Sequence, residues 1–341
     1  MINRLLTHRE DSGNLSHSEV VLVDLDYELP EITPPGTLAV TRIKEPLLGP
    51  SFTHPSTAFE VIKMHFVGNA ISRSPSQQVY EAMYDLAQTA RELSLPHVPT
   101  VIRLPAQVIA TGRDFMEKLW QVFKVTELVQ ADGSSTEMLE SLATLNSVPI
   151  QRFTQGVVEN KLSAMEDYEV RLQSYFHRSG PTTGLPAWHD LPLMTIPSAR
   201  KVFSFATSQD TFAAVLLLDA LVDPGDTHDA VLGSIGAVVA VAKGHFEQEL
   251  RPHVRTQRGS LPRLLWSDAF NLYAAHSECL GMVYLAEIDT ENLEVLVYTP
   301  VSETKLAVGS DRILLLVHPG RRQHRWLHSG WIASEVEGAE P

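Results

Sequence analysis

Cysteine is almost absent from this sequence, because Cys279 is the only one among 341 residues. A single cysteine excludes an internal disulfide bond and any metal site built from several thiolates, and it is typical of a reducing compartment. Cys279 lies in an apolar stretch, so we expect a buried structural thiol and not a nucleophile.

Long hydrophobic runs are missing too. The longest apolar segments, Phe212–Val222 and Ala237–Ala242, are shorter than the roughly 18 residues that cross a bilayer, and Asp, Gly or Lys interrupts or flanks them. The first residues are charged and lack the apolar centre of a secretion signal. We therefore expect no membrane contact and a cytosolic or nuclear location.

Positive charge is scarce: 27 Lys and Arg stand against 41 Asp and Glu, which gives a net charge of −14. This argues against a surface that binds nucleic acid everywhere, because lysine and arginine carry phosphate binding. It leaves room for a local basic groove. A hydrophobic content of 44% is typical of a soluble globular protein, and the length suits one large or two ordinary domains.

The motifs that usually mark an active site are also absent. The sequence has no Gly-x-x-x-x-Gly-Lys-Ser/Thr phosphate loop, no Gly-Lys dipeptide and no Gly-x-Gly-x-x-Gly. It has no His-Glu-x-x-His pair and no Gly-x-Ser-x-Gly elbow either. These absences argue against zinc-protease and serine-hydrolase chemistry.

A pair of carboxylates is present at the end of an apolar run, Val20–Asp26. The continuous apolar pattern predicts a strand covered on both faces. Carboxylates at the end of such a strand can hold Mg²⁺ while the metal bridges phosphate oxygens. The alternative is an aspartate that caps a turn. Asp24 and Asp26 are therefore the candidate catalytic residues and the candidate Mg²⁺ ligands.

The first part of the chain alternates strands and helices. The patterns predict strands at 20–26, 37–43, 61–67, 98–104 and 125–130, and helices at 76–93, 113–123, 136–145 and 164–176. This order predicts an α/β fold with a mainly parallel sheet and flanking helices.

The final third has a different pattern, with short β-type runs between turn residues. We predict strands at 202–206, 213–218, 231–242, 281–288, 295–298 and 313–317, with a hairpin turn over Asp289–Asn292. This region is predicted to form a β-rich second domain.

Two basic clusters stand out against the acidic background. They could pair with phosphates and stack on the bases of single-stranded RNA. The alternative is a solvated loop, or a patch that faces an acidic partner. The candidate RNA contacts are Arg251, Arg255 and Arg258 in the first cluster, and Arg321 and Arg322, close to Trp326, in the second.

The order of residues in the segment after Asp24-Leu25-Asp26 is a more specific indication of a protein family than its composition is. It contains Pro30-Glu31-Ile32-Thr33-Pro34-Pro35-Gly36, then Glu45-Pro46 and Gly49-Pro50-Ser51-Phe52-Thr53-His54. Together these elements resemble the eukaryotic polynucleotide 5′-hydroxyl-kinase family, in particular its nucleolar branch that acts in pre-ribosomal RNA processing. His65-Phe66-Val67-Gly68 and Leu172–His177 resemble later elements of the same family.

The resemblance implies a P-loop-type kinase core that transfers the γ-phosphate of ATP to the 5′-hydroxyl of RNA with Mg²⁺. It also implies a location in the nucleus, specifically the nucleolus, and a partner endonuclease. On this basis we expect an incomplete P-loop-kinase-like α/β domain at 1–178, a linker at 179–200, a C-terminal β-rich domain at 201–330 and a flexible tail at 331–341.

The sequence departs from the family pattern in three places. The family's N-terminal domain and its strand, phosphate loop and helix are not found. Glu28-Leu29 stands where the family has Gly-Gln, and Arg103–Gln107 stands where an Asn-Thr-x-Gly-Trp clamp is expected. A truncated sequence explains only the first difference.

Two functions therefore stay open at this point. One is an ATP-dependent RNA 5′-hydroxyl kinase in ribosomal RNA processing. The other is a catalytically dead pseudokinase that acts as an interaction or scaffold protein in RNA processing, so whether the chain is an enzyme is undecided. A sheet without its first strands would also expose an edge at Val20–Asp26, and we expect residues 1–19, the C-terminal domain or a partner chain to cover it.

Overall fold

The structure is a computed structural model. It describes residues 1–7, 17–49, 51, 54, 59–68, 76–93, 97–105, 108–109, 112–131, 137–153, 163–176, 199–204, 212–218, 238–244, 261–265, 277–306 and 312–317. The chain divides into two compact units, Met1–Tyr168 and Glu169–Pro341. The boundary falls inside helix α6 (Ala164–Phe176).

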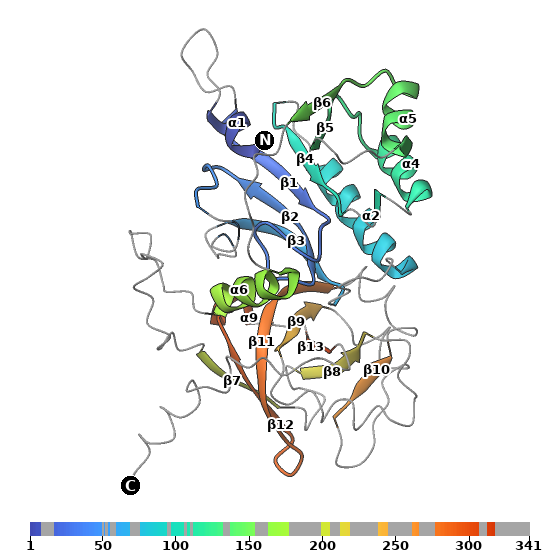
Figure 1. Ribbon diagram of the computed structural model, residues 1–341. Helices are drawn as coiled ribbons and strands as arrows, with labels where there is room; N and C mark the ends of the chain where they lie inside the picture. Colours follow the sequence, from blue (N-terminus) through green and yellow to red (C-terminus); the bar gives the residue numbers. More distant parts are fainter. Residues whose placement is uncertain are drawn as a thin grey trace. The chain divides into compact units, whose positions relative to one another are not determined.

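The first unit is built on a four-stranded sheet with the strand order β3-β2-β1-β4 (Figure 1). Its strands are β1 (Val20–Asp24), β2 (Thr37–Ile43), β3 (Glu60–Phe66) and β4 (Thr100–Arg103). All five residues of β1 are buried, as its continuous apolar pattern predicts.

The strand directions in this sheet are mixed and not mainly parallel. β1 and β2 are antiparallel, as are β2 and β3, whereas β1 and β4 are parallel. No α-helix is found among the described residues between β1, β2 and β3, and each chain reversal there gives an antiparallel neighbour. Helix α2 (Gln77–Glu92) comes before β4 and allows the parallel return. The α/β class with flanking helices is confirmed.

The expected open edge at β1 is not found. β4 pairs along β1 on the side opposite β2, so β1 is an interior strand. Helix α1 (Ile2–Thr7) adds Leu6 to an apolar cluster with Val20 and Leu22. Residues 1–7 therefore pack against the apolar side chains of β1 and do not cover a strand edge.

Gly36 explains the Pro-Pro-Gly element between β1 and β2. Its φ is +86°, a conformation that L side chains rarely adopt. A Cβ atom there would lie 2.8 Å from Phe66 Cε2 and 3.2 Å from the carbonyl oxygen of Gly68. The turn therefore needs glycine for its backbone angle and for close packing against the end of β3.

Three helices of the first unit begin and end within one residue of their predicted limits, whereas α1 was not predicted. Helix α2 begins after Ser76, whose Oγ accepts a hydrogen bond of 3.4 Å from the N–H of Val79. This helix packs against β1, β2, β3 and helix α4 (Arg113–Val122). A polar cluster also ties α2 to β3, because Asp85 lies 2.6 Å from His65 Nε2 and 2.7 Å from Lys63 Nζ. The unit also contains α5 (Glu137–Leu145) and a parallel pair of strands, β5 (Leu128–Ala131) and β6 (Ile150–Phe153).

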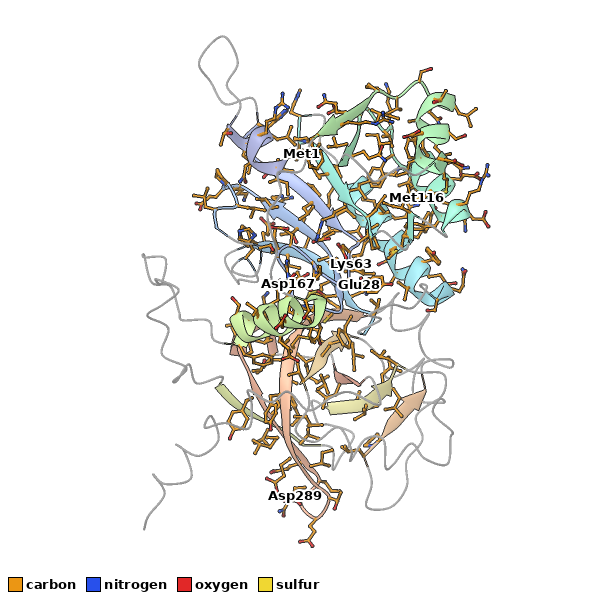
Figure 2. The ribbon with its side chains drawn as sticks, in the orientation of Figure 1. Met1, Glu28, Lys63, Met116, Asp167 and Asp289 are labelled. Carbon is orange, nitrogen blue, oxygen red and sulfur yellow. The ribbon has the colours of Figure 1, made fainter. Side chains whose placement is uncertain are left out.

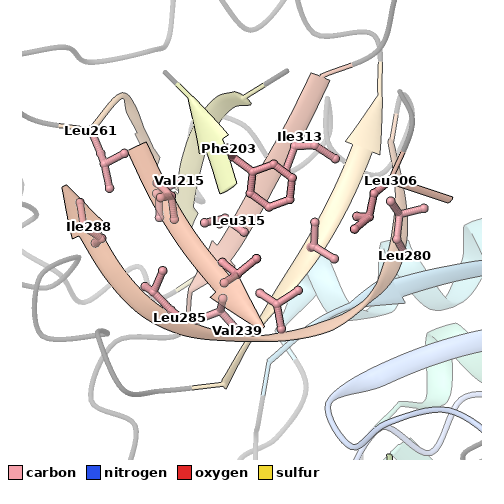
Figure 3. Close-up of a cluster of buried hydrophobic side chains, with 14 of the residues drawn as sticks. Phe203, Val215, Val239, Leu261, Leu280, Leu285, Ile288, Leu306, Ile313 and Leu315 are labelled. Carbon is pink, nitrogen blue, oxygen red and sulfur yellow. The ribbon is translucent and has the colours of Figure 1, made fainter. Parts of the chain in front are cut away.

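The second unit contains a seven-stranded mixed sheet in the order β10-β8-β13-β9-β11-β12-β7. Figure 3 shows strands curving around its apolar core, which includes Phe203, Val239 and Leu315. The C-terminal β-rich region is confirmed. The elements are β7 (Ala199–Ser204), β8 (Phe212–Leu217), β9 (Val238–Gly244), β10 (Arg263–Leu265), β11 (Ser277–Asp289), β12 (Glu294–Thr299), α9 (Glu303–Leu306) and β13 (Arg312–Val317).

The predicted hairpin between β11 and β12 is confirmed. Asp289 lies at its tip (Figure 2), where Oδ1 accepts hydrogen bonds of 2.9 and 2.8 Å from the N–H groups of Glu291 and Asn292. Leu293 has a φ of +58° and closes the turn.

The predicted domain limits remain predictions. Most of the linker at 179–200 and the whole tail at 331–341 lie outside the described residues, and β7 already begins at Ala199. Within the described part of the chain, no helix has the length and hydropathy to cross a membrane.

Candidate functional site

The end of strand β1 brings the two candidate carboxylates together. Asp24 is the last residue of β1, and its side chain is only 3% exposed. Asp26 follows in the connection to β2 with 18% of its side chain exposed. Both carboxylates therefore lie at the same end of the strand, and that of Asp24 is almost completely buried.

Arg103 is the partner that sequence reasoning missed. It ends β4, and Asp24 and Arg103 are directly opposite each other in the parallel register of β1 and β4. Opposed residues place their side chains on the same face of a sheet. The guanidinium lies between both carboxylates: Nη1 is 3.3 Å from each oxygen of Asp24, and Nη2 is 3.0 Å from Oδ2 of Asp26.

The Asp24 carboxylate has donors on both oxygens. Oδ1 accepts from the N–H of Asp26 at 3.2 Å, and Oδ2 accepts from the N–H of Glu31 at 2.6 Å. Together with the contacts from Arg103 Nη1, each oxygen has two donors. An ionised carboxylate offers about four lone-pair directions, so these contacts account for all of them.

Arg103 is equally well held. Its Nη1 also donates to the carbonyl oxygen of Leu29 at 2.6 Å. Burial lowers the pKa of Arg103, but the carboxylates of Asp24, Asp26 and Glu31 raise it by more, so the pKa is raised and the guanidinium stays charged. For Asp24, burial raises the pKa from 3.8 to about 6 against the opposing effects of Arg103 and the N–H of Glu31.

A second layer of contacts links the site to the segments that carry the family resemblance. Glu31 Oε1 lies 2.8 Å from Nδ1 of His54, a buried residue whose Nε2 is 3.3 Å from the carbonyl oxygen of Leu48. The Glu31 of Pro-Glu-Ile-Thr-Pro-Pro-Gly and the His54 of Gly-Pro-Ser-Phe-Thr-His are thus direct partners. Their pairing fixes the backbone N–H that Glu31 donates to Asp24.

This arrangement does not fit a magnesium ion. Mg²⁺ needs carboxylate oxygens with free lone pairs in near-octahedral geometry, and at Asp24 protein donors take those positions. Among the described residues, no group of three or more His, Cys, Asp or Glu side chains could hold a metal ion. The cation that joins Asp24 and Asp26 in the structure is Arg103.

The basic clusters cannot be placed. Arg251, Arg255, Arg258, Arg321 and Arg322 all lie outside the described residues. Their assignment as RNA contacts stays a prediction.

Comparisons with known proteins show what the chain and its first unit resemble. The family described as "mRNA cleavage and polyadenylation factor CLP1 P-loop" matches residues 13–178. The polynucleotide 5′-hydroxyl-kinase GRC3 of Gibberella zeae is 26% identical over an alignment that covers 96% of this chain and 48% of that protein. The chain is thus similar to polynucleotide 5′-hydroxyl-kinases along nearly its whole length.

A second polynucleotide 5′-hydroxyl-kinase gives a similar match. The polynucleotide 5′-hydroxyl-kinase grc3 of Aspergillus fumigatus is 28% identical over 71% of this chain and 30% of its own length. The chain therefore spans half or less of these relatives. The residues matched by the family model, 13–178, include the whole four-stranded sheet of the first unit, with both Asp24 and Arg103.

Solved structures support the fold. Two structures of Clp1p in complex with Pcf11p match with TM-scores of 0.52 and 0.51, each at 13% identity and covering 88% of this chain and 67% of the other. One of them describes the structural basis for ATP loss in a point mutant of that protein. At this identity the likeness shows the fold alone, which is the P-loop-kinase-like fold expected from the sequence.

Proposed function

We propose that this protein works in RNA processing as a polynucleotide 5′-hydroxyl-kinase homologue that binds RNA and protein partners without transferring phosphate at Asp24 and Asp26. The observation that carries the proposal is the contact of Arg103 with both carboxylates. Phosphoryl transfer depends on a metal ion and on cationic groups that hold the γ-phosphate. At this strand end the carboxylates have a guanidinium partner. The N–H groups on Nη1 of that guanidinium already donate to Asp24 and to the carbonyl oxygen of Leu29, so they are not free to bind a phosphate.

The biological setting follows from the family. We propose the nucleolus as the location, an RNA from ribosomal RNA processing as the ligand and a processing endonuclease as the protein partner. The Clp1p structures support a partner-binding role, since Clp1p is seen there in complex with Pcf11p. A fluorescent fusion that is excluded from nucleoli would contradict the proposed location.

The deciding experiment measures phosphate transfer directly. The chain is incubated with a 5′-hydroxyl RNA oligonucleotide, Mg²⁺ and ATP labelled at the γ-phosphate. We expect no more labelled RNA than the Asp24→Asn/Asp26→Asn double variant produces. Turnover by the unaltered chain that the double variant loses would refute the binding-only role.

A second candidate function is the kinase activity itself. It is favoured by the similarity to proteins named polynucleotide 5′-hydroxyl-kinase across 96% of the chain and by the presence of both carboxylates at the strand end. This function requires ATP and Mg²⁺, and Arg103 would have to leave the carboxylates. The same labelling assay separates the two candidates.

A further inference from the structure

The cation at the end of β1 belongs to the protein chain itself. Asp24 is buried and negatively charged at neutral pH, and a buried charge is costly unless a counter-charge and hydrogen bonds stabilise it. The guanidinium of Arg103 supplies the counter-charge with contacts of 3.3 Å to Asp24 and 3.0 Å to Asp26. Among the described residues, no other lysine or arginine forms an ion pair with either carboxylate.

We propose that Arg103 is the resident cation of the Asp24–Asp26 pair and replaces a divalent metal ion there. The inference rests on the proposed function, because it explains why the strand end keeps its carboxylates without phosphate transfer. The carboxylates have become structural groups whose task is to fix Arg103, and through it the ends of β1 and β4.

The geometry explains why the guanidinium is suited to this position. A guanidinium is planar and presents several N–H donors in a fixed arrangement. Arg103 uses this arrangement to reach the two carboxylates and the carbonyl oxygen of Leu29 at once. The parallel register between β1 and β4 places it there without any distortion of the strands.

Removing Arg103 has a specific consequence. Asp24 and Asp26 would then face each other without a counter-charge, and Asp24 would still be buried. A hard divalent cation with oxygen ligands is the group that restores neutrality. We therefore expect Arg103→Met to convert a metal-independent protein into one that binds and is stabilised by Mn²⁺ or Mg²⁺.

The test compares thermal unfolding and Mn²⁺ binding, followed by electron paramagnetic resonance, for the full chain and its variants. The unaltered chain should show the same unfolding midpoint with EDTA and with millimolar Mn²⁺. Arg103→Met should unfold at lower temperature in EDTA, recover part of the loss with Mn²⁺, and bind Mn²⁺ at least about tenfold more tightly than the unaltered chain. Adding Asp24→Asn to Arg103→Met should abolish both effects.

Two further variants keep the result interpretable. Arg103→Lys keeps a positive charge and should stay insensitive to Mn²⁺ even if it is less stable. Arg113→Ala removes an exposed arginine that pairs with Glu117 and should behave as the unaltered chain. If Arg103→Met does not fold in EDTA, refolding in Mn²⁺ provides the same comparison.

Two results would overturn the inference. One is binding of Mn²⁺ by the unaltered chain that Asp24→Asn removes. The other is an Arg103→Met protein that neither binds Mn²⁺ nor gains stability from it, with or without refolding. Neither result depends on phosphate transfer, so the fate of the proposed function is judged separately by the RNA labelling assay.

Discussion

Asp24 shows how burial can outweigh an ion pair. Its pKa is raised to about 6 because loss of water around the carboxylate costs more than Arg103 and the backbone N–H groups return. Buried ion pairs commonly behave in this way, since removing both charges from water is expensive. The charged form of Asp24 therefore lowers the free energy of unfolding, although its contacts order the strand end.

The raised pKa predicts a pH dependence of stability. The folded protein holds the Asp24 proton more tightly than the unfolded chain, so this stabilisation is present below pH 3.8 and is lost as the pH rises through about 6. The unfolding free energy of the unaltered chain minus that of Asp24→Asn should fall by about 3 kcal/mol across this window. Chemical denaturation at several pH values measures the difference.

Asp85 provides a control of opposite sign. Burial raises its pKa, but hydrogen bonds and charge from His65 and Lys63 lower it by more, so the pKa is lowered. Its contribution is present above the ordinary pKa and is lost as the pH falls. The corresponding difference for Asp85→Asn should therefore rise with pH, and equal slopes for the two variants would refute the Asp24 assignment.

Cys279 is predicted to be unreactive in the folded protein. Its side chain is buried, and burial raises the thiol pKa from 9.0 to about 12, so almost no thiolate exists at pH 8. A thiol reagent should label the native chain at least about a hundredfold more slowly than the unfolded chain. A Cys279→Ser/Ser302→Cys variant, with its thiol at an exposed position, should react quickly when folded. Rapid native labelling of Cys279 would contradict its burial.

The candidate site was half predictable from the sequence. The carboxylate pair Asp24 and Asp26 could be predicted because an apolar run and the point where it ends are recognised from neighbouring residues alone. Arg103 appeared only as a departure from the expected clamp, since its role depends on the register between β1 and β4. A possible signal was its position at the end of the next parallel strand, where residues meet the end of β1.

At the scale of elements, the long strand β11 has a β-bulge whose backbone contacts a side chain of helix α6. The register with β9 shifts between Cys279 and Gly281, and Gly281 has a φ of +152°. Tyr175 of α6 uses the space, since its Oη accepts a hydrogen bond of 3.0 Å from the N–H of Met282. A Cβ at Gly281 would collide with the Tyr175 hydroxyl and lie 2.8 Å from Val301 Cγ2.

Gly281→Ala is therefore expected to destabilise the second unit by about 3 kcal/mol or more, from backbone strain and overpacking. Denaturant unfolding measures the loss. In a Tyr175→Phe background, where the hydroxyl is gone, the same substitution should cost less. A cost that is unchanged by Tyr175→Phe would show that the contact with the hydroxyl is unimportant.

Elements with strong periodicity were predicted well, and most of the elements that the patterns missed are short. The helix expected at 164–176 is α6 with the same bounds, because its apolar spacing is regular. The strand expected at 281–288 is longer in β11, since Gly281 interrupts the apolar pattern without ending the pairing. The sequence patterns missed α1, β6, β10 and α9, which have only three to six residues each.

At the scale of the whole molecule, the net charge of −14 means that the proposed binding of RNA would depend on local basic clusters. Arg321→Ala/Arg322→Ala should weaken binding of a single-stranded RNA. It should also reduce the slope of log affinity against log salt by about 1.4, the value for two lost phosphate contacts. Fluorescence anisotropy across a salt series measures both quantities.

A control variant shows whether the loss of any exposed arginine has the same effect on RNA binding. Arg113→Ala removes an exposed arginine from α4 and should leave affinity and slope almost unchanged. The triple variant at Arg251, Arg255 and Arg258 tests the other cluster in the same way, with a slope change of about 2.1. If these variants match Arg113→Ala, the clusters are not RNA contacts.

The pairing of Asp24 with Arg103 also bears on how the protein is made. The two residues are 79 positions apart in the sequence, and a ribosome that adds 5–20 residues per second needs roughly 4–16 s to cover that distance. During this interval β1 has been synthesised, but the strand that neutralises its buried carboxylate has not. We expect the apolar Val20–Val23 segment to be available to chaperones until β4 emerges, so that synthesis speed and chaperone supply influence the yield of correctly folded protein.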